Sequence, residues 1–401
     1  MRAGRGFNSV LPPRPPYFTL GEKTMKRLLS LLIIVGLLST IGIGCSQTPA
    51  APKVFKIYHF GDITGPYAPI TLPLVNAFED ALKYVNEKGL IKGGVKLEHE
   101  WMDTGGKLDQ AIAAYTKFRE AKPALMFIYG STEGEALKAR FAEDKIVVMS
   151  YSVSDAQMVP PGWIFGALPA YTDQFGAFID WMTANWKGAN PPKLAFLTWD
   201  SAFGKAVSAA PGSLAYAKTK NVQIVATEYM AMNAVDVSTQ LLRIKDAGAD
   251  WVYSNTLGAS PGVMLKDAKR LGLTMKFAGG PWAMDWAPVR VAGEAGEGFV
   301  GPQSYASWSE TNNEGIKLLT EQFTKYNRKP EEKGLAYICV WSGILTTVET
   351  LNRAIDKVGF DKLDGPAVKA AMEGLKDYSP MGLTYYTFSS SKVSPLKTRI
   401  M

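Results

Sequence analysis

Residues 125–150 read LMFIYGSTEGEALKARFAEDKIVVMS, and this stretch decides the fold class. The apolar runs Leu125–Tyr129 and Ile146–Met149 have the length and composition of buried strands. Between them, Glu133–Phe141 has the apolar spacing of a helix. A strand, a crossover helix and a second strand form the basic unit of a parallel sheet. We therefore predict an α/β fold.

The same alternation extends in both directions along the chain. Before this unit we expect strand Val54–His59, helix Leu72–Val85, strand Val95–Trp101 and helix Leu108–Arg119. After it the pattern restarts, with strands Leu194–Thr198, Val222–Thr227, Trp251–Ser254 and Met275–Ala278 and helices Lys205–Thr219, Val237–Ala247 and Val263–Leu271. A helical stretch then runs over 314–371, broken near 328–334 and 359–365, before a β-like run at Leu383–Phe388. Because about 350 residues exceed the usual size of one core, two similar halves predict two lobes.

The net charge of +7 is concentrated at the N-terminus. Residues 1–44 contain six basic side chains and one acidic side chain, which leaves 38 basic and 36 acidic residues in the remainder. An almost neutral body has no electrostatic footprint for nucleic acid.

The N-terminal segment has the composition of an export signal. Met25-Lys26-Arg27 is basic, residues 28–43 are almost wholly apolar, and the run ends at Gly44-Cys45. This order is typical of a secretory signal, and the apolar run is shorter than the roughly 20 residues of a membrane-spanning helix. We expect residues 1–24 to be an unstructured upstream extension, 25–44 a signal peptide and 45–53 a tether. Met25 is an alternative start.

The residues around Cys45 resemble the lipobox of bacterial lipoproteins, in which the cysteine thiol receives a lipid. Gly42 departs from that pattern, which usually has leucine there. A plain cleaved signal and an uncleaved anchor are the alternatives. The resemblance implies a lipid-anchored protein in the periplasm or at the cell surface of a bacterium. With Cys45 lipidated, the second cysteine, Cys339, has no disulfide partner, and its apolar surroundings predict a core residue.

The inventory of residues argues against an enzyme. The two histidines, His59 and His99, both lie in expected strands, whereas a zinc site or a Ser-His-Asp triad needs a histidine that faces a pocket. His59 lies near a strand end, but a structural role is the more common one. The sequence contains no phosphate-binding loop and no dinucleotide-binding glycine turn. We expect no catalytic residue, metal or cofactor.

Polar residues follow two of the expected strands, where ligands of open α/β sheets bind. Ser131 and Thr132 come after the strand that ends at Tyr129, and Ser152 and Ser154 come after the next strand. Hydroxyls beside a helix N-terminus suit a carboxylate or another anionic oxygen, although such residues also serve as simple helix caps.

Aromatic residues also gather after the expected strands. The candidates are Tyr67, Trp199, Phe203, Trp282 and Trp286. Aromatic side chains at strand ends build the mostly apolar walls of solute clefts, while others of them pack under loops.

These positions resemble those of the type I periplasmic binding proteins of the leucine/isoleucine/valine class, from about Val54 to Pro395. The matching motifs, all in the same order, are Gly65-Pro66-Tyr67, Asn86-Glu87-Lys88-Gly89, Asp103, Gly130-Ser131-Thr132, Ser201-Ala202-Phe203-Gly204, Leu271-Gly272-Leu273, Gly296-Glu297-Gly298 and Met381-Gly382-Leu383-Thr384. The resemblance implies two Rossmann-like lobes with parallel sheets, joined by a hinge of three crossovers. Family members usually continue for another strand or two beyond Lys392–Pro395, so a missing or an unusually short C-terminal edge is expected.

The resemblance also implies how the chain divides. Lobe 1 would comprise 54–168 and 303–380, and lobe 2 would comprise 169–302 and 381–398. The crossovers would fall near Leu168–Ala170, Val300–Gln303 and Met381–Thr384.

In that family, groups that match Ser131, Thr132, Ser152 and Ser154 hold a ligand carboxylate, and Tyr67 and Phe203 match aromatic walls. The acid that pairs with an amino acid's ammonium falls at Pro281 or Trp282, with Asp285 displaced by three or four residues. A buried ammonium without a counter-charge is costly. We therefore expect a small organic acid, an amide or an aromatic compound as the ligand.

The resemblance further implies a solute receptor that delivers its ligand to the permease and ATPase subunits of an ABC importer. One alternative is a receptor that presents the solute to a chemoreceptor or sensor kinase. Another, from a different class, is an exported hydrolase.

Overall fold

The computed structural model describes Pro13, Pro16, residues 53–393, Pro395 and residues 397–401, except for the side chains of residues 286, 287 and 289. The expected signal segment 25–44 and Cys45 lie outside these residues. No helix within the described part of the chain is long and apolar enough to cross a membrane.

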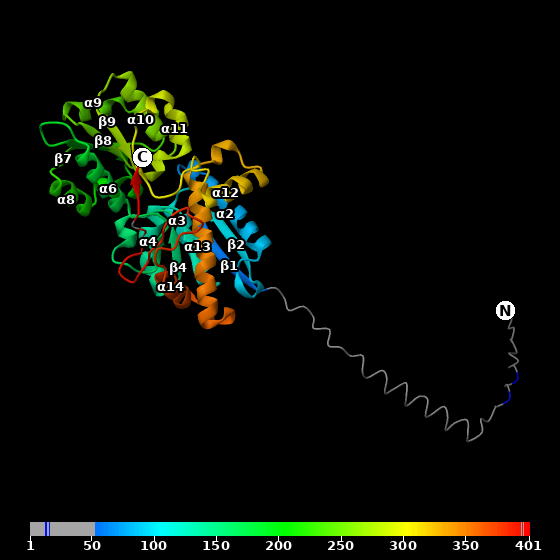
Figure 1. Cartoon of the computed structure of the whole chain (residues 1–401). Coiled ribbons are helices and arrows are strands. Elements are labelled where there is room, and N and C mark those ends of the chain that lie inside the picture. Colours follow the sequence, from blue (N-terminus) through cyan, green and yellow to red (C-terminus); the bar gives the residue numbers. More distant parts are fainter. Residues whose placement is uncertain (1–12, 14–15, 17–52, 394, 396) are drawn as a thin grey trace, which may run out of the picture. The chain divides into compact units, whose positions relative to one another are not determined.

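Five parallel strands form the first sheet, in the order β2-β1-β3-β4-β5. Their bounds are β1 (Val54–Gly61), β2 (Lys96–Asp103), β3 (Leu125–Ile128), β4 (Val147–Ser150) and β5 (Ile164–Gly166). Every residue of β3 and β4 is buried, as expected for parallel strands covered on both faces. The helices associated with this sheet are α2 (Ala68–Lys88), α3 (Leu108–Arg119), α4 (Ser131–Glu143), α5 (Asp155–Met158), α12 (Glu314–Lys325), α13 (Leu335–Val358) and α14 (Gly365–Glu373). Figure 1 shows α13 among the elements of this lobe, where it packs along α2.

Four parallel strands form the second sheet, in the order β7-β6-β8-β9. They are β6 (Lys193–Trp199), β7 (Gln223–Met230), β8 (Trp251–Ser254) and β9 (Lys276–Gly279). Their helices are α6 (Tyr171–Ala184), α7 (Ala202–Ser208), α8 (Pro211–Thr219), α9 (Ser238–Asp246), α10 (Ser260–Arg270) and α11 (Trp286–Ala292). The green and yellow elements of this sheet gather in their own lobe in Figure 1, so the predicted two-lobe α/β architecture is confirmed.

Two of the expected elements are wrong in detail. The single helix expected over 205–219 is two helices, α7 and α8, because Pro211 lacks an N–H and starts a new helix at its first turn. The β-like run at 383–388 is not a strand of either sheet. It forms one isolated bridge, between Tyr386 and Tyr378, and the ring of Phe388 packs on Phe165 of β5 at 5.3 Å. Helix α6 was not expected.

Two connections between the sheets lie at the expected positions. Residues 167–170 join β5 to α6. The second connection leaves the second sheet at Val300, which bridges Ala278, and continues into β10 (Pro302–Gln303).

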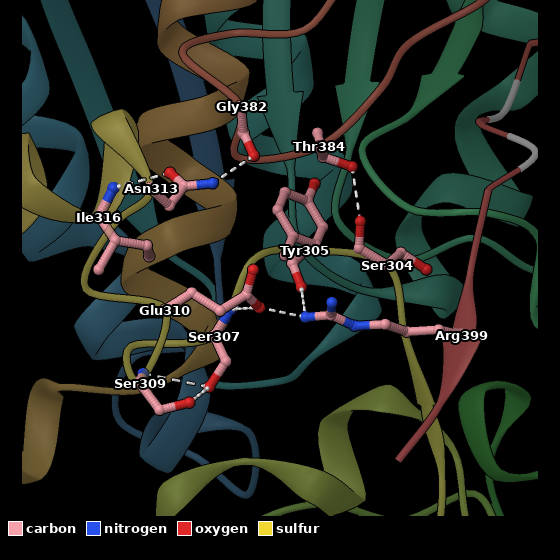
Figure 2. Close-up of polar contacts among 10 residues, drawn as sticks. All are labelled: Ser304, Tyr305, Ser307, Ser309, Glu310, Asn313, Ile316, Gly382, Thr384 and Arg399. Carbon is pink, nitrogen blue, oxygen red and sulfur yellow. Dashed lines mark hydrogen bonds and ion pairs between the residues drawn. The ribbon is translucent and has the colours of Figure 1, made fainter.

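A third strand runs beside the second connection, because β11 (Arg399–Ile400) pairs antiparallel with β10. The chain reaches β11 from Val393, whose carbonyl accepts a hydrogen bond of 2.7 Å from Gly166 N in the first sheet. Residues 381–384, expected at the third crossover, lie beside the residues that follow β10. Figure 2 shows Thr384, whose Oγ1 donates to the Ser304 carbonyl at 2.7 Å. The hinge motion and the division of the chain between the lobes stay predictions.

Candidate functional site

The first wall of the candidate site lies at the carboxyl ends of β3 and β4. Helix α4 begins at Ser131, directly after Tyr129 and Gly130, so its first N–H groups lie at the sheet edge. Ser131 and Ser152 are each 2% exposed, and their Oγ atoms are hydrogen-bonded to one another. The structure thus brings together two hydroxyls that are separated by 21 positions in the sequence.

The second wall comes from the second lobe. Trp282, in the short helix η2 (Pro281–Met284), donates from Nε1 to Tyr171 Oη at 3.2 Å. The ring of Phe203 lies edge-on to that of Tyr171, with centroids 5.4 Å apart. Tyr67, from the first lobe, contacts Phe203 edge-on at 6.4 Å between centroids. Aromatic rings from both lobes therefore meet across the site.

A cavity of about 20 Å³ lies between these walls. Its lining residues are Tyr67, Ile70, Thr71, Leu74, Tyr129, Gly130, Ser131, Ser152, Tyr171, Phe203, Leu257 and Trp282. None of these described residues is Asp, Glu, Lys, Arg or His. The wall is apolar and aromatic, with a few polar atoms that can fix the orientation of a ligand.

A second cavity of about 30 Å³ adjoins the first and shares Tyr67, Tyr129 and Ser131 with it. Two carboxylates line this second cavity. Asp62 accepts from the backbone N–H of Tyr67 at 2.8 Å, and Glu133 Oε1 accepts from Gly130 N at 2.7 Å. Burial, together with the nearby Asp62, raises the pKa of the Glu133 carboxyl above its ordinary value.

The predicted residues divide between the cavities and their surroundings. Tyr67, Ser131, Ser152, Phe203 and Trp282 line the first cavity, and Thr132 lines only the second.

Three other candidates are directed elsewhere. Trp199 is buried behind the site and donates from Nε1 to Ser260 Oγ at 2.9 Å. Ser154 Oγ donates to Glu135 Oε1 at 2.6 Å. Asp285 Oδ1 accepts from the backbone N–H of Leu335 at 2.7 Å, and Asp285 lines neither cavity. The side chain of Trp286 lies outside the described residues.

Sequence reasoning missed Tyr171, Tyr129 and Leu257 as lining residues. Tyr171 directly follows the predicted crossover Leu168–Ala170, and this position at the junction of the lobes was the available signal. Tyr129 was counted as the last residue of a strand. No pattern in the sequence distinguished Leu257 from a core leucine.

The two histidines contact each other and neighbouring aromatic side chains. His59 is fully buried, and its ring stacks on Phe78 with centroids 4.3 Å apart. Its Nδ1 lies 2.8 Å from Tyr129 Oη and its Nε2 lies 2.9 Å from His99 Nδ1. Burial, with a smaller contribution from His99, holds the pKa of His59 well below its ordinary value. Neither histidine lines the cavities, and among the residues described no group of three or more His, Cys, Asp or Glu could hold a metal ion.

Known proteins resemble this chain over most of its length. The sequence profile of the periplasmic binding proteins matches residues 55–392. A leucine-, isoleucine-, valine-, threonine- and alanine-binding protein of Pseudomonas aeruginosa is 20% identical over 339 residues, which cover 83% of this chain and 85% of that protein.

Solved structures share the fold. A branched-chain amino acid ABC transporter protein of Thermus thermophilus with bound valine has a TM-score of 0.80 at 24% identity, covering 87% of this chain and 93% of that chain. A solute-binding protein of an ABC transporter from R. palustris, in complex with 4-hydroxybenzoate, has a TM-score of 0.69 at 18% identity, covering 82% of this chain and 88% of that chain. With the profile match and the two α/β lobes that enclose the site, the chain belongs to the type I periplasmic binding proteins, a family of solute-binding proteins and not a class of enzymes.

Proposed function

We propose that this protein is the solute-binding component of an ABC importer and that it binds a small organic acid, amide or aromatic compound between its lobes. The observation that carries the proposal is the cavity enclosed by Ser131 and Ser152 on one side and Tyr171, Phe203 and Trp282 on the other. Family membership and the ABC-transporter relatives with valine and 4-hydroxybenzoate support the general role.

The two walls suit different parts of one ligand. The hydroxyls of Ser131 and Ser152, together with the first N–H groups of α4, can donate to a carboxylate or amide oxygen. The aromatic rings of the second lobe offer a flat apolar surface to the body of the ligand.

An α-amino acid fits this cavity less well. Its ammonium group would be buried against lining residues that include no Asp or Glu. Leaving a desolvated charged group unpaired costs on the order of 1–3 kcal/mol or more. At about 1.4 kcal/mol per factor of ten, this corresponds to roughly a tenfold to hundredfold loss of affinity.

Isothermal calorimetry with leucine, benzoate and benzamide tests the ligand class. We expect benzoate or benzamide to bind more tightly than leucine. Ser131→Ala should lower the affinity for the better ligand by about tenfold, because a hydrogen bond to a charged or polar oxygen is lost. Ser208→Ala is the matched control, since the buried Ser208 hydroxyl has no hydrogen-bond partner in the described chain and lies outside both cavities.

Tight binding of leucine with no binding of the other two would refute the proposed ligand class. Glu133→Gln would then identify the counter-charge, because Glu133 lines the adjoining cavity. Mass spectrometry of compounds that co-purify with the protein gives an independent check of the ligand class.

We also propose that Cys45 is lipidated and begins the mature protein, which would anchor it in the periplasm or at the cell surface. The basic segment, apolar run and Gly44-Cys45 junction support this proposal. Cys45→Ser should release the protein from the membrane fraction and leave the signal uncleaved. Cys339→Ser is the control, because Cys339 is fully buried in α13. Unchanged membrane association of Cys45→Ser would contradict the lipid anchor.

A further inference from the structure

The N-terminus of α13 receives its cap from the other lobe. Helix α13 has 24 residues, and the residue at its N-cap, Gly334, has no side chain with which to cap it. The backbone N–H of Leu335, the first helical residue, donates instead to Asp285 Oδ1 at 2.7 Å. Asp285 follows η2 of the second lobe and is only 6% exposed.

Leu335 is fixed to the first lobe by the residues that precede it. Glu332 Oε2 accepts from Asn76 Nδ2 of α2 at 2.7 Å, and the guanidinium of Arg328 pairs with Asp80 of α2. The contact between Asp285 and Leu335 therefore joins the two lobes, and we refer to it as the Asp285 cap.

The Asp285 cap leaves no room for a side chain at residue 334. A Cβ atom at residue 334 would lie 2.2 Å from Asp285 Oδ1, far inside van der Waals contact. The backbone of Gly334 is extended, with φ −126° and ψ −171°, so alanine would be tolerated there but for this contact.

The Asp285 cap lies close in sequence to the solute cavity. Trp282, which lines that cavity, precedes Asp285 by three residues in the same short segment. A movement that brings Trp282 onto a solute would thus also bring Asp285 onto the end of α13.

We infer that Asp285 is a positioning residue that stabilises the closed arrangement of the lobes by capping α13 from the opposite lobe. A carboxylate satisfies an otherwise uncapped N–H and favours the positive end of the helix dipole. Separation of the lobes would break this contact. The inference rests on the proposed two-lobe solute binding, but its test requires no solute.

The test compares variants of the ligand-free protein. Small-angle scattering measures the lobe separation, and hydrogen exchange measures protection of the Leu335 amide. Asp285→Ala should lower the ratio of closed to open molecules by about tenfold, which corresponds to about 1.4 kcal/mol. We expect a larger radius of gyration and faster exchange at Leu335. Asp285→Asn, which keeps an acceptor oxygen, should retain much of the effect of the native residue.

Asp364→Ala is the matched control. Asp364 is the N-cap residue of α14 and accepts a hydrogen bond from Ala367 N at 2.9 Å. Both partners of this cap belong to the same helix end, so the cap does not join the lobes. Its loss should reduce stability without changing the lobe separation.

A second variant tests the same contact from the other side. Gly334→Ala should open the lobes as Asp285→Ala does, and the double variant should add little to either one, because both break one contact. Gly374→Ala, at the end of α14 where a Cβ meets only ordinary contacts, is its control. If Asp285→Ala does not fold, Gly334→Ala is the variant that tests the contact.

The inference would be overturned if Gly334→Ala or Asp285→Ala left both the scattering and the exchange of the Leu335 amide unchanged. It would also be overturned if Asp364→Ala expanded the protein equally. Weak binding of every tested solute would instead count against the proposed function.

Discussion

The buried ring of His59 stacks on Phe78 and lies next to His99, and we expect this pair of histidines to make the stability of the fold sensitive to mildly acidic pH. Its pKa and that of His99 are lowered, mainly by burial, so both imidazoles stay neutral in the folded chain at pH values where an unfolded histidine becomes protonated. The stabilising contribution is therefore fully present above the unfolded pKa of about 6.5 and is lost as the pH falls from there toward the folded pKa. Each histidine contributes up to about 1.4 kcal/mol per pH unit in this window.

Urea unfolding between pH 7.5 and 5 measures this effect. We expect the free energy of unfolding to fall with pH, and we expect His59→Phe to reduce the slope, because one of the two histidines of the chain is removed. The phenyl ring can keep the stacking on Phe78. A slope that is the same in the variant and the native chain would show that His59 does not carry the pH dependence.

At the same scale, the sequence predicted individual site residues unevenly. Ser131 and Ser152 were predicted to meet because residues after neighbouring parallel strands lie at one sheet edge, and Phe203 and Trp282 follow strands of the second sheet in the same way. All four line the first cavity, and their contact with a ligand stays a prediction. The sequence suggested that Asp285 lies beside the ligand, because it follows Trp282 by three residues. In the structure its carboxylate accepts a hydrogen bond from the N-terminus of a helix in the other lobe. A contact between segments that lie 50 positions apart leaves no local pattern to recognise.

Among the elements, a buried ion pair between Asp80 and Arg328 links α2 to the segment after α12, and Tyr337 of α13 joins it. The Arg328 guanidinium, beyond the end of α12, donates to both oxygens of Asp80 in α2, from Nε at 2.7 Å and from Nη2 at 2.8 Å. Tyr337 of α13 also donates to Asp80 Oδ2, at 3.1 Å. The Asp80 side chain is 0% exposed and that of Arg328 is 16% exposed. Removing one member of such a pair leaves an uncompensated charge.

Asp80→Ala should lower the free energy of unfolding by about 3–5 kcal/mol in chemical denaturation. Lys325→Ala is the matched control, because Lys325 of α12 pairs with Glu87 of α2 at the surface, where both side chains are about half exposed. This second change should cost at most about 1 kcal/mol. Similar losses in the two variants would contradict the importance of burial.

Elements with a strong period or a clear stop signal were predictable, and the others were not. The strand at 251–254 and the helix at 108–119 have the expected bounds, because their apolar spacing is regular. The aromatic run 383–388 has the composition of a strand, but its backbone bonds go to single partners such as Ala306, whose N–H donates to the Leu383 carbonyl at 2.8 Å. Composition alone does not determine which partner a β-like segment finds.

For the whole molecule, the size of the cavities bears on how solute enters. The cavity lined by residues of both lobes, from Ser131 to Trp282, has a volume of about 20 Å³, and the adjoining cavity within the first lobe has a volume of about 30 Å³, whereas ligand pockets usually measure roughly 300–1,000 Å³. Tyr67 on one lobe and Phe203 on the other occupy the space between the walls. We therefore expect a solute to enter an arrangement in which these rings have separated.

We accordingly expect the ligand-free protein to exchange between open and closed arrangements, and a saturating solute to select closed molecules. Small-angle scattering should show a smaller radius of gyration with the best-binding compound from the calorimetric screen than without it. The free energy of unfolding should rise with solute concentration, by about 2.7 kcal/mol at a hundred times Kd, and the midpoint of thermal unfolding should rise with it.

Phe203→Ala should weaken binding, because the ring that meets Tyr67 across the cavity is lost. Phe388→Ala is the control: Phe388 packs on Phe165, so its loss should reduce stability and leave affinity unchanged. A radius of gyration that does not change on saturation, together with a normal thermal shift, would mean that the solute binds without lobe closure and that only side chains such as Tyr67 move to admit it.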